Sequence, residues 1–251
     1  GLETQVGRFR RGDRMLVVGA YRPTVESDET PNGVAPAWGP SGSSDPISAA
    51  LFLVDESGAR EPEFERGRDS EGVLTIETRP GRYVSSLEVL DVANRRAWRA
   101  RQGVVQEPLL RGMVDVSDLM ILNANAPLPD SLADALPHLR PGIRVYPGER
   151  FPVVWEAYGL GVLEPVRVTI GFSEGRPRFR ERVEDFTDVS DQEIQITFDD
   201  TGPDQEQAVF RSIEIELPDL DPGEYTLHLR LELGGREPLT ISRPIIVDRP
   251  D

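Results

Sequence analysis

Two distant stretches of the chain share one pattern, a glycine turn followed by an apolar run that ends at a tyrosine. The first runs from Gly12 to Tyr21 and the second from Gly148 to Tyr158. A second shared mark follows each of them, and it reads Pro80-Gly81-Arg82-Tyr83 in the first half and Pro222-Gly223-Glu224-Tyr225 in the second. Because the marks come in the same order and at similar distances, the sequence predicts a duplicated domain.

Strand signals dominate both halves. In residues 225–233 the odd positions are apolar and the even positions polar, which is the alternation of a strand with one buried and one wet face. Other short apolar runs are bounded by glycine, proline or acidic turns. Strands are predicted at 15–21, 49–54, 73–78 and 83–92, then at 117–122, 143–146, 151–158, 166–172, 193–198, 209–217, 225–233 and 240–247.

Helical signals are scarce. Only residues 130–136 read as a helix, capped by Asp130 or Ser131 and stopped by Pro137. Parallel α/β folds need crossover helices, so many short strands without helices favour antiparallel sheets. The expected fold is all-β, with two tandem antiparallel β-sandwich domains of the immunoglobulin or fibronectin-III type, related by internal duplication. The Pro-Gly-x-Tyr marks fit the tyrosine corner of such folds.

The predicted first domain covers residues 1–112 and the second 113–251, with the boundary inside 107–117. The two copies differ by their insertions. The first carries a Pro/Gly-rich loop at 22–48, and the second an acidic stretch at 180–210. Loops longer than about 15 residues inside a compact domain are usually functional or disordered, so recognition is expected in these two insertions.

Composition excludes several classes of protein. The net charge of −16 argues against a general nucleic-acid binder, which needs a basic footprint. The chain has no cysteine, so disulfides, thiolate zinc sites and cysteine nucleophiles are excluded. No run approaches the ~18 apolar residues of a membrane span, so no transmembrane segment is expected. Because the sequence begins with Gly1, we expect an upstream signal peptide, lipidated stem or domain.

The second half resembles the C-terminal β-sandwich region of bacterial GWxTD-domain proteins, although the Gly-Trp-x-Thr-Asp signature itself is absent. The resemblance implies an exported protein from bacteria such as the gemmatimonads, and it supplies no catalytic residue. The segments that carry it are residues 116–119, 146–149, 156–160 and 220–227, with a looser likeness at 80–83 and 86–89.

Catalytic constellations are missing from the sequence. Its two histidines, His138 and His228, fall in a loop beside a proline and on the polar side of a strand. No Gly-x-Ser-x-Gly elbow and no phosphate-binding glycine loop is present. Acidic pairs are expected by chance among 44 carboxylates. We therefore expect a protein that is not an enzyme and that uses no cofactor.

One acidic turn is the best metal candidate. Asp199, Asp200, Asp204 and Glu206 gather carboxylates in one short segment, and calcium prefers several oxygen ligands from a flexible loop. The favoured alternative is a solvated acidic turn that protects a strand edge. The tripeptide Arg11-Gly12-Asp13 matches an integrin-recognition motif, but a turn shared with Gly148 explains it better.

Arginine–aromatic clusters are the predicted contact surfaces, because arginine and tryptophan are enriched at interface hot spots. The favoured alternative is a strand whose arginines pair with the abundant carboxylates. Trp155 lies in a predicted strand and Trp98 in an arginine–aromatic run that is also expected to be extended, and core packing is the default for both. Trp38 lies in the Pro/Gly-rich loop. The candidate contact residues are Trp38, then Arg95, Arg96, Trp98, Arg99 and Arg101, then Arg178, Phe179 and Arg180.

The expected function is that of an extracytoplasmic scaffold subunit, periplasmic or at the cell surface, that braces a larger membrane-embedded complex. A gemmatimonad photosynthetic reaction centre with its antenna rings would suit this interpretation. The expected partners are protein subunits, with lipid headgroups as a further option. The alternatives are a carbohydrate- or peptide-binding module and the accessory domains of a cell-envelope protein, and fold analogy alone does not choose among them.

Overall fold

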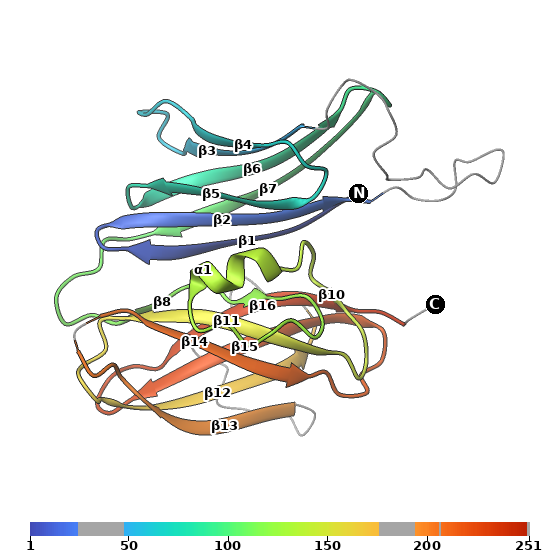
Figure 1. Ribbon diagram of the computed structural model, residues 1–251. Helices are drawn as coiled ribbons and strands as arrows, with labels where there is room; N and C mark the ends of the chain where they lie inside the picture. Colours follow the sequence, from blue (N-terminus) through green and yellow to red (C-terminus); the bar gives the residue numbers. More distant parts are fainter. Residues whose placement is uncertain (25–47, 176–193, 206, 250–251) are drawn as a thin grey trace. The chain divides into compact units, whose positions relative to one another are not determined.

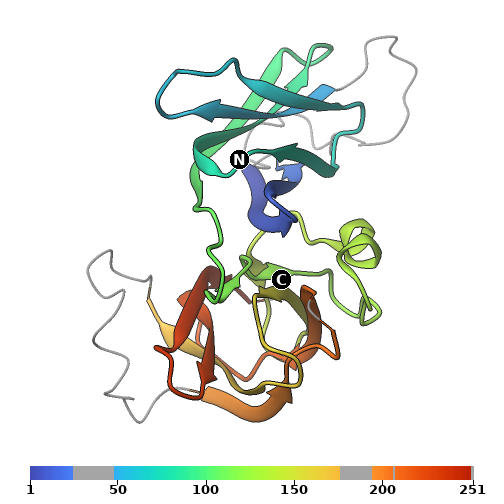
Figure 2. The ribbon, with the colours of Figure 1, turned by 90° about the vertical axis from the view of Figure 1, so that its left-hand side faces the viewer.

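The computed structural model describes residues 1–24, 48–175, 194–205 and 207–249. The protein is all-β, and it divides into two compact units (Figures 1 and 2). Unit 1 comprises Gly1–Pro108 with Arg140–Gly142, and unit 2 comprises Leu109–Leu139 with Ile143–Asp251. The division at Pro108 lies inside the predicted boundary region. The short segment Arg140–Gly142 had been predicted in the second domain. None of the described helices is long and apolar enough to cross a bilayer.

Unit 1 is a sandwich of two antiparallel sheets (Figure 1). The small sheet has the order β1-β2-β5, and the large sheet has the order β4-β3-β6-β7. Alternate residues of both sheets point inward to a core that includes Val17, Leu51, Leu87 and Val89. The strands are β1 (Leu2–Arg11), β2 (Arg14–Pro23), β3 (Ser48–Asp55), β4 (Glu63–Gly67), β5 (Gly72–Thr78), β6 (Gly81–Asp91) and β7 (Arg96–Gln106).

Unit 2 has its own core between two sheets, which contains Phe151, Trp155, Leu229 and Ile245. Its small sheet has the order β8-β11-β14, with β9 also paired to β11, and its large sheet has the order β13-β12-β15-β16-β10. The strands are β8 (Asp115–Val116), β9 (Met120–Ile121), β10 (Arg144–Val145), β11 (Arg150–Tyr158), β12 (Pro165–Glu174), β13 (Ile194–Thr201), β14 (Val209–Glu216), β15 (Gly223–Leu233) and β16 (Leu239–Val247).

The two units follow the same strand order. Strands β1 to β7 of unit 1 correspond in turn to β8/β9, β11, β12, β13, β14, β15 and β16, and unit 2 adds β10, which pairs in parallel with β16. The sequence marks fall at equivalent places. Gly12 and Gly148 precede the central strands β2 and β11 of the small sheets, whereas Gly81 and Gly223 begin β6 and β15.

Two local predictions need correction. Residues 117–122 do not form one strand, because Ser117 receives the Glu156 amide on its hydroxyl and interrupts the ladder between β8 and β9. The helix α1 covers only Leu132–Ala135, with Ser131 as its N-cap. Pro137 does not stop it, since a 3₁₀ turn, η2 (Leu136–His138), continues the coil with the proline in its first turn, where a missing N–H costs little.

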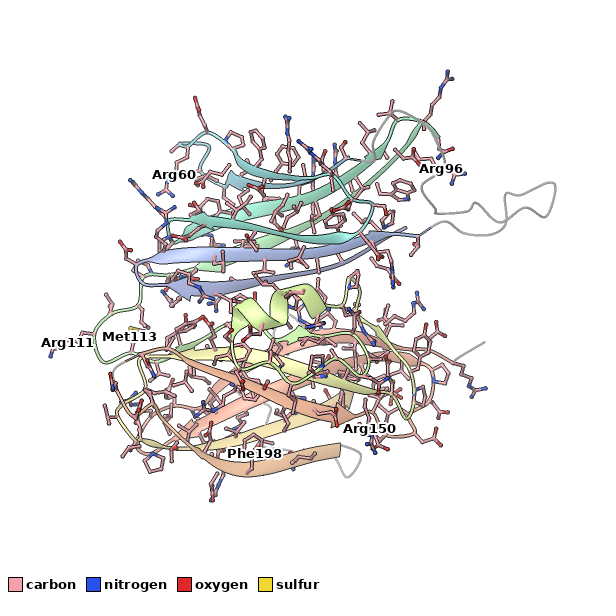
Figure 3. The ribbon with its side chains drawn as sticks, in the orientation of Figure 1. Arg60, Arg96, Arg111, Met113, Arg150 and Phe198 are labelled. Carbon is pink, nitrogen blue, oxygen red and sulfur yellow. The ribbon has the colours of Figure 1, made fainter. Side chains whose placement is uncertain are left out.

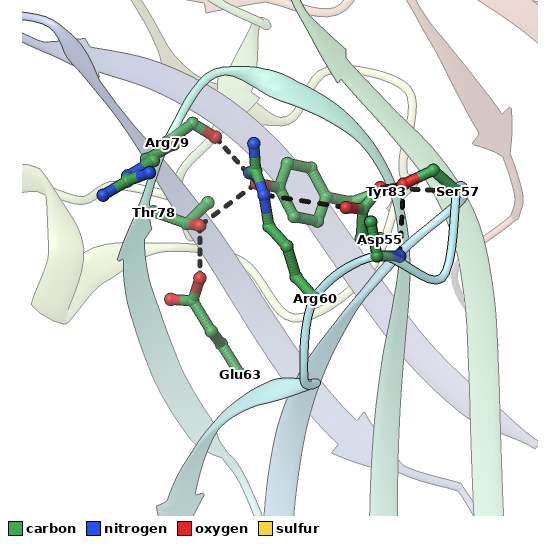
Figure 4. A network of polar contacts seen from close by, with 8 residues as sticks. Asp55, Ser57, Arg60, Glu63, Thr78, Arg79 and Tyr83 are labelled. Atoms are coloured by element: carbon green, nitrogen blue, oxygen red, sulfur yellow. Dashed lines mark hydrogen bonds and ion pairs between the residues drawn. The ribbon is translucent and has the colours of Figure 1, made fainter.

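In a tyrosine corner the hydroxyl of the tyrosine donates to nearby backbone, and such a bond is present in unit 1 (Figure 4). Tyr83 donates to the carbonyl of Arg79 (2.9 Å) and accepts from the guanidinium of Arg60 (2.6 Å). Thr78 donates to the carboxylate of Glu63 (2.5 Å). Each hydroxyl proton is thus used in a short bond, and the corner is held by polar contacts that involve two connections of the chain, β3–β4 and β5–β6.

An aspartate loop completes this corner. Asp55 accepts from the amide and the hydroxyl of Ser57 (3.0 and 2.9 Å), and Arg60 lies 3.7 Å from its other oxygen. The amide hydrogen bond, then the hydroxyl bond and the arginine charge lower the pKa of Asp55 below its ordinary 3.8. The loop therefore favours an ionised Asp55, which keeps Arg60 beside the tyrosine.

The equivalent residue of unit 2 behaves differently. Tyr225 is half-buried, and no hydrogen bond joins its hydroxyl to another residue in the described part of the chain. Burial, followed by the nearby carboxylates of Glu174 and Asp221, raises its pKa above 10.0. The shared Pro-Gly-x-Tyr mark therefore fixes the start of a strand in both units but forms a hydroxyl-bonded corner in one.

In each unit, a polar side chain on the last strand, at an equivalent position, donates a hydrogen bond toward the small sheet. Val104 pairs with Tyr83, and Ile245 pairs with Tyr225. Gln102 and Arg243 each lie two residues before these pairing residues and are therefore equivalent. Gln102 donates to the carbonyl of Val6 (3.3 Å), and Arg243 donates to that of Leu119. Burial lowers the pKa of Arg243, and the charge of Asp118 opposes that shift. The last strand thus binds backbone of β1 in unit 1 and of the connection between β8 and β9 in unit 2.

Candidate interaction face

The outer face of the β4-β3-β6-β7 sheet carries apolar side chains and arginines together. Strand pairing places Phe64, Phe52, Ser86 and Arg101 in one row across the four strands. We call this surface the Phe–Arg face. Its members are Phe52 and Val54 on β3, Phe64 and Arg66 on β4, Val84, Glu88 and Leu90 on β6, and Arg99 and Arg101 on β7.

Large apolar side chains on this face are open to solvent. The exposed fractions are 41% for Val54, 51% for Phe64, 36% for Val84 and 46% for Leu90. Soluble proteins expose single apolar residues freely, but neighbouring ones on a sheet form a patch of the kind that marks interaction sites. The patch lies on the side of the sheet that faces away from the core of unit 1.

Small side chains hollow the face beside these apolar groups. Ala50 and Ala97 lie next to Phe52 and Leu90, and the groove between them has a volume of about 530 Å³. Arg66 lines the groove from β4, while Glu88 and Arg99 line it from β6 and β7. Ligand-binding grooves are of this size and usually combine an apolar floor with a few charged groups.

The arginines of the face differ in what they contact. Arg66 stacks over the ring of Phe64, 5.1 Å from its centroid, and Arg99 forms an ion pair with Glu88 (2.8 Å). Within the described residues, neither Arg66 nor Arg101 forms an ion pair with a carboxylate. In a protein of net charge −16, two such cations on one small face are a local reversal of sign.

The hairpin between β6 and β7 carries two more of the predicted arginines. Its four linking residues are held by Asp91, which accepts from the amide of Asn94 (3.0 Å). Arg95 has a φ of 53°, a left-handed conformation that costs a non-glycine residue ~1 kcal/mol. Arg96 begins β7 at the end of this hairpin and is exposed (Figure 3).

The structure separates the predicted cluster on β7 into two sides. Arg99 and Arg101 lie on the Phe–Arg face, whereas Trp98 points inward and packs against the core of unit 1. Trp155 is 2% exposed and belongs to the core of unit 2, which was its default interpretation. The predicted contact residues Trp38, Arg178, Phe179 and Arg180 lie outside the described residues.

Seven of the nine members of the face were not singled out from the sequence, namely Phe52, Val54, Phe64, Arg66, Val84, Glu88 and Leu90. One signal was present. Residues 49–54 are apolar at every position, yet β3 can turn only alternate residues toward the core of a two-layer sandwich. The other half of this run therefore had to reach the outer surface, as Phe52 and Val54 do.

The acidic turn is not assembled as a metal site among the described residues. Asp199 and Asp200 are neighbours on β13 and point to opposite faces of the sheet. Asp199 pairs with Arg167 (3.2 Å), and Asp200 accepts two bonds from Arg211 (2.7 and 3.0 Å). Glu206 lies outside the described part of the chain. Among the described residues, which include Asp204, no three carboxylate or histidine side chains are placed to hold a metal ion together.

The remaining sequence candidates fall on structural features. The Arg11-Gly12-Asp13 tripeptide spans the tight hairpin of β1 and β2, where Gly12 has a φ of 61°. That conformation suits the first position of a two-residue hairpin loop. His138 ends η2, and His228 lies on the outer side of β15, where it is buried. The two histidines are thus in separate elements.

Comparison with known proteins does not assign the chain. No model of a protein family matches it, and no curated protein matches it. The Phe–Arg face is therefore the feature of the molecule from which a function can be inferred.

Proposed function

We propose that this protein is a non-enzymatic scaffold subunit that joins other proteins through exposed sheet surfaces. The observation that carries the proposal is the Phe–Arg face, where Phe64 and Val84 are exposed beside Arg66 and Arg101, which have no ion pair among the described residues. A solvated sheet face does not need these groups for folding, because only the inner face builds the core. Their combination is typical of protein-binding surfaces.

The proposal includes the origin and place of the protein. The shared strand order supports duplication of an immunoglobulin- or fibronectin-III-like sandwich, and the resemblance to the GWxTD-domain proteins supports an exported, extracytoplasmic protein. Two such units in one chain suit a subunit that braces a larger membrane-associated assembly. A gemmatimonad reaction centre with its antenna rings is the assembly that we would examine first.

A carbohydrate-binding module is the second candidate, and the groove of about 530 Å³ on the Phe–Arg face favours it. A sugar platform presents coplanar exposed rings. The rings of Phe52 and Phe64 lie 5.8 Å apart but are tilted by 38°, and Trp98 faces the core. Arginine beside tilted phenylalanines fits a protein partner better than a flat sugar face.

The proposal is tested by mild detergent extraction of native membranes, followed by size separation and mass spectrometry of the fractions that contain this chain. Stoichiometric co-migration with a membrane complex is expected, together with release of the chain at high salt, since charged contacts are screened there. Migration of the chain alone, with the complex intact elsewhere, would contradict a scaffold function.

A further inference from the structure

We infer that the partner of the Phe–Arg face is a protein segment that presents an apolar side chain between two carboxylates about 14 Å apart. This inference rests on the proposed scaffold function and specifies the chemistry of its partner. Arg66 on β4 and Arg99 on β7 are the two ends of one cross-strand row that also contains Ala50 and Glu88. Three interstrand spacings of ~4.8 Å separate the ends of that row.

The positive charge of the face determines that its partner carries negative charge. Arg66 and Arg101 carry full charges without an ion pair in the described chain, and Arg99 shares its charge with Glu88, whose side chain is 33% exposed. An approaching carboxylate gains a charge-assisted hydrogen bond from each guanidinium. A basic partner would instead place like charges together at close range, which disfavours binding.

The groove determines what lies between the carboxylates. Its walls of Phe52 and Leu90 and its floor of Ala50 accept an apolar or aromatic side chain, which would be flanked by Arg66 and Arg99. A buried anchor surrounded by charged contacts that exclude water is the usual arrangement of a binding hot spot. In an extended segment, residues two apart share a face, so a carboxylate, an anchor and a second carboxylate fit at alternate positions spanning ~13 Å.

A protein segment fits this face better than an anionic membrane. The apolar residues lie on the flat face of a sheet, and 51% for Phe64 is the largest exposed fraction among them, so none of them forms a protruding wedge. A bilayer also presents an extended negative plane, which would meet the acidic surface around the face as well as its arginines. A protein segment needs to match only the face, because beyond ~8 Å the remaining charges are screened.

The size of the face sets the expected strength. Four strands at ~4.8 Å and five residues at ~3.3 Å give about 300 Å², well below the ~800 Å² that each partner buries in a standard interface. Binding to an isolated segment should therefore be micromolar or weaker. Tighter attachment would need several such contacts acting together.

The test measures binding of the intact chain to two synthetic peptides, by titration calorimetry at low salt. The probe peptide is Ser-Glu-Ser-Phe-Ser-Glu-Ser in two tandem copies, and the control peptide replaces each glutamate by arginine. The test variant is Arg66→Glu/Arg101→Glu, which reverses one end of the row and the cation that lies two residues from the other end, Arg99, on β7. Arg99 itself is kept, because its removal would leave Glu88 without its ion pair. The matched control variant, Arg167→Glu/Arg230→Glu, reverses two arginines on the corresponding sheet of unit 2, where both have acidic partners. Vesicles of phosphatidylglycerol serve as the membrane probe.

We expect the acidic peptide to bind the wild type and the unit 2 variant equally. Binding to Arg66→Glu/Arg101→Glu should be weaker by at least about tenfold. If that variant fails to fold, the wild type at ~0.5 M salt must show the same loss. Absence of acidic-peptide binding, equal binding of the arginine peptide, or preferential binding to the vesicles would overturn the inference. Co-migration with a native complex that Arg66→Glu/Arg101→Glu does not disturb would overturn it too, while the scaffold function would stand.

Discussion

The large sheets of the two units have the same strand order, but their outer surfaces carry different kinds of side chain. In unit 1 the outer surface is the Phe–Arg face, with exposed apolar groups. In unit 2 the rows read Asp199-Arg167-Glu232 and Thr197-Thr169-Arg230, in which both arginines have ion pairs. The inner surfaces of both sheets are apolar, as folding requires. The comparison teaches that the shared strand order determines the apolar inner side, whereas the exposed apolar groups on the outer side of unit 1 are not required by it.

The largest expected difference between the units concerns the polar link between the last and first strands. Arg243→Ala removes a buried donor, leaves the carbonyl of Leu119 without it and opens a cavity, so we expect a loss of about 3 kcal/mol. Gln102→Ala removes the exposed equivalent and should cost less than about 1 kcal/mol. Denaturant unfolding with hydrogen exchange on β15 and β6 measures both, and equal losses would show that the two links are the same.

The next largest difference is expected between the equivalent tyrosines, Tyr83 and Tyr225. Tyr83→Phe leaves Arg60 and the carbonyl of Arg79 without their hydroxyl partner, and it should cost about 2 kcal/mol. Tyr225→Phe removes a hydroxyl that makes no hydrogen bond to the described chain, and it should change the free energy of unfolding by less than about 0.5 kcal/mol. Thermal unfolding of both variants provides the measurement. A costly Tyr225→Phe would reveal a hydroxyl bond that the account lacks.

The loss of an ion pair should cost more in unit 2 than in unit 1, and this difference should be smaller than the one between the tyrosines. Asp200→Asn disrupts a two-pronged pair with Arg211 and should cost about 1 kcal/mol, whereas Glu88→Gln weakens a single exposed pair with Arg99 and should cost about 0.3 kcal/mol. The same unfolding series can include millimolar calcium. Because Asp199 and Asp200 already bind arginines, we expect no change of the midpoint, and a clear rise would restore the acidic turn as a metal site.

The smallest effect should be confined to acid. The pKa of Asp55 in the folded state lies below its ordinary 3.8, so the stabilisation from this carboxylate is complete above that value and is lost as the pH falls through the folded pKa. The difference in stability between the wild type and Asp55→Asn should therefore be constant near neutral pH and shrink below about pH 4. A difference that instead grows as the pH falls would show that folding does not lower the pKa of Asp55.

The sequence could predict those strands whose inner face reads directly from alternation. β15 was predicted within two residues of its start, because Leu227, Leu229 and Leu231 alternate with polar residues. β1 was not predicted, because Gln5, Arg8 and Arg10 interrupt its apolar positions. It becomes a strand by pairing with β2 along its whole length. Its formation depends on tertiary contacts that composition does not contain.

The candidate site was predictable only in part for the same reason. Arg99 and Arg101 were predicted from the sequence as contact residues because arginine and tryptophan cluster there. Phe52 and Phe64 come from separate strands, and only the register of β3 with β4 places them opposite each other. The inward turn of Trp98 depends on the register of β7. A shift of one residue would exchange the faces, so residue type alone could not decide which arginines share a surface with the aromatic rings.

Hydrogen exchange of the chain, free and within its native assembly, would test most directly whether the Phe–Arg face is the docking surface. The account predicts slower exchange in β3, β4, β6 and β7 of the bound chain, around Ser48–Asp55, Glu63–Gly67, Gly81–Asp91 and Arg96–Gln106. It predicts unchanged exchange in the corresponding strands of unit 2, Pro165–Glu174 and Ile194–Thr201. Protection of the unit 2 strands with an unprotected Phe–Arg face would contradict it.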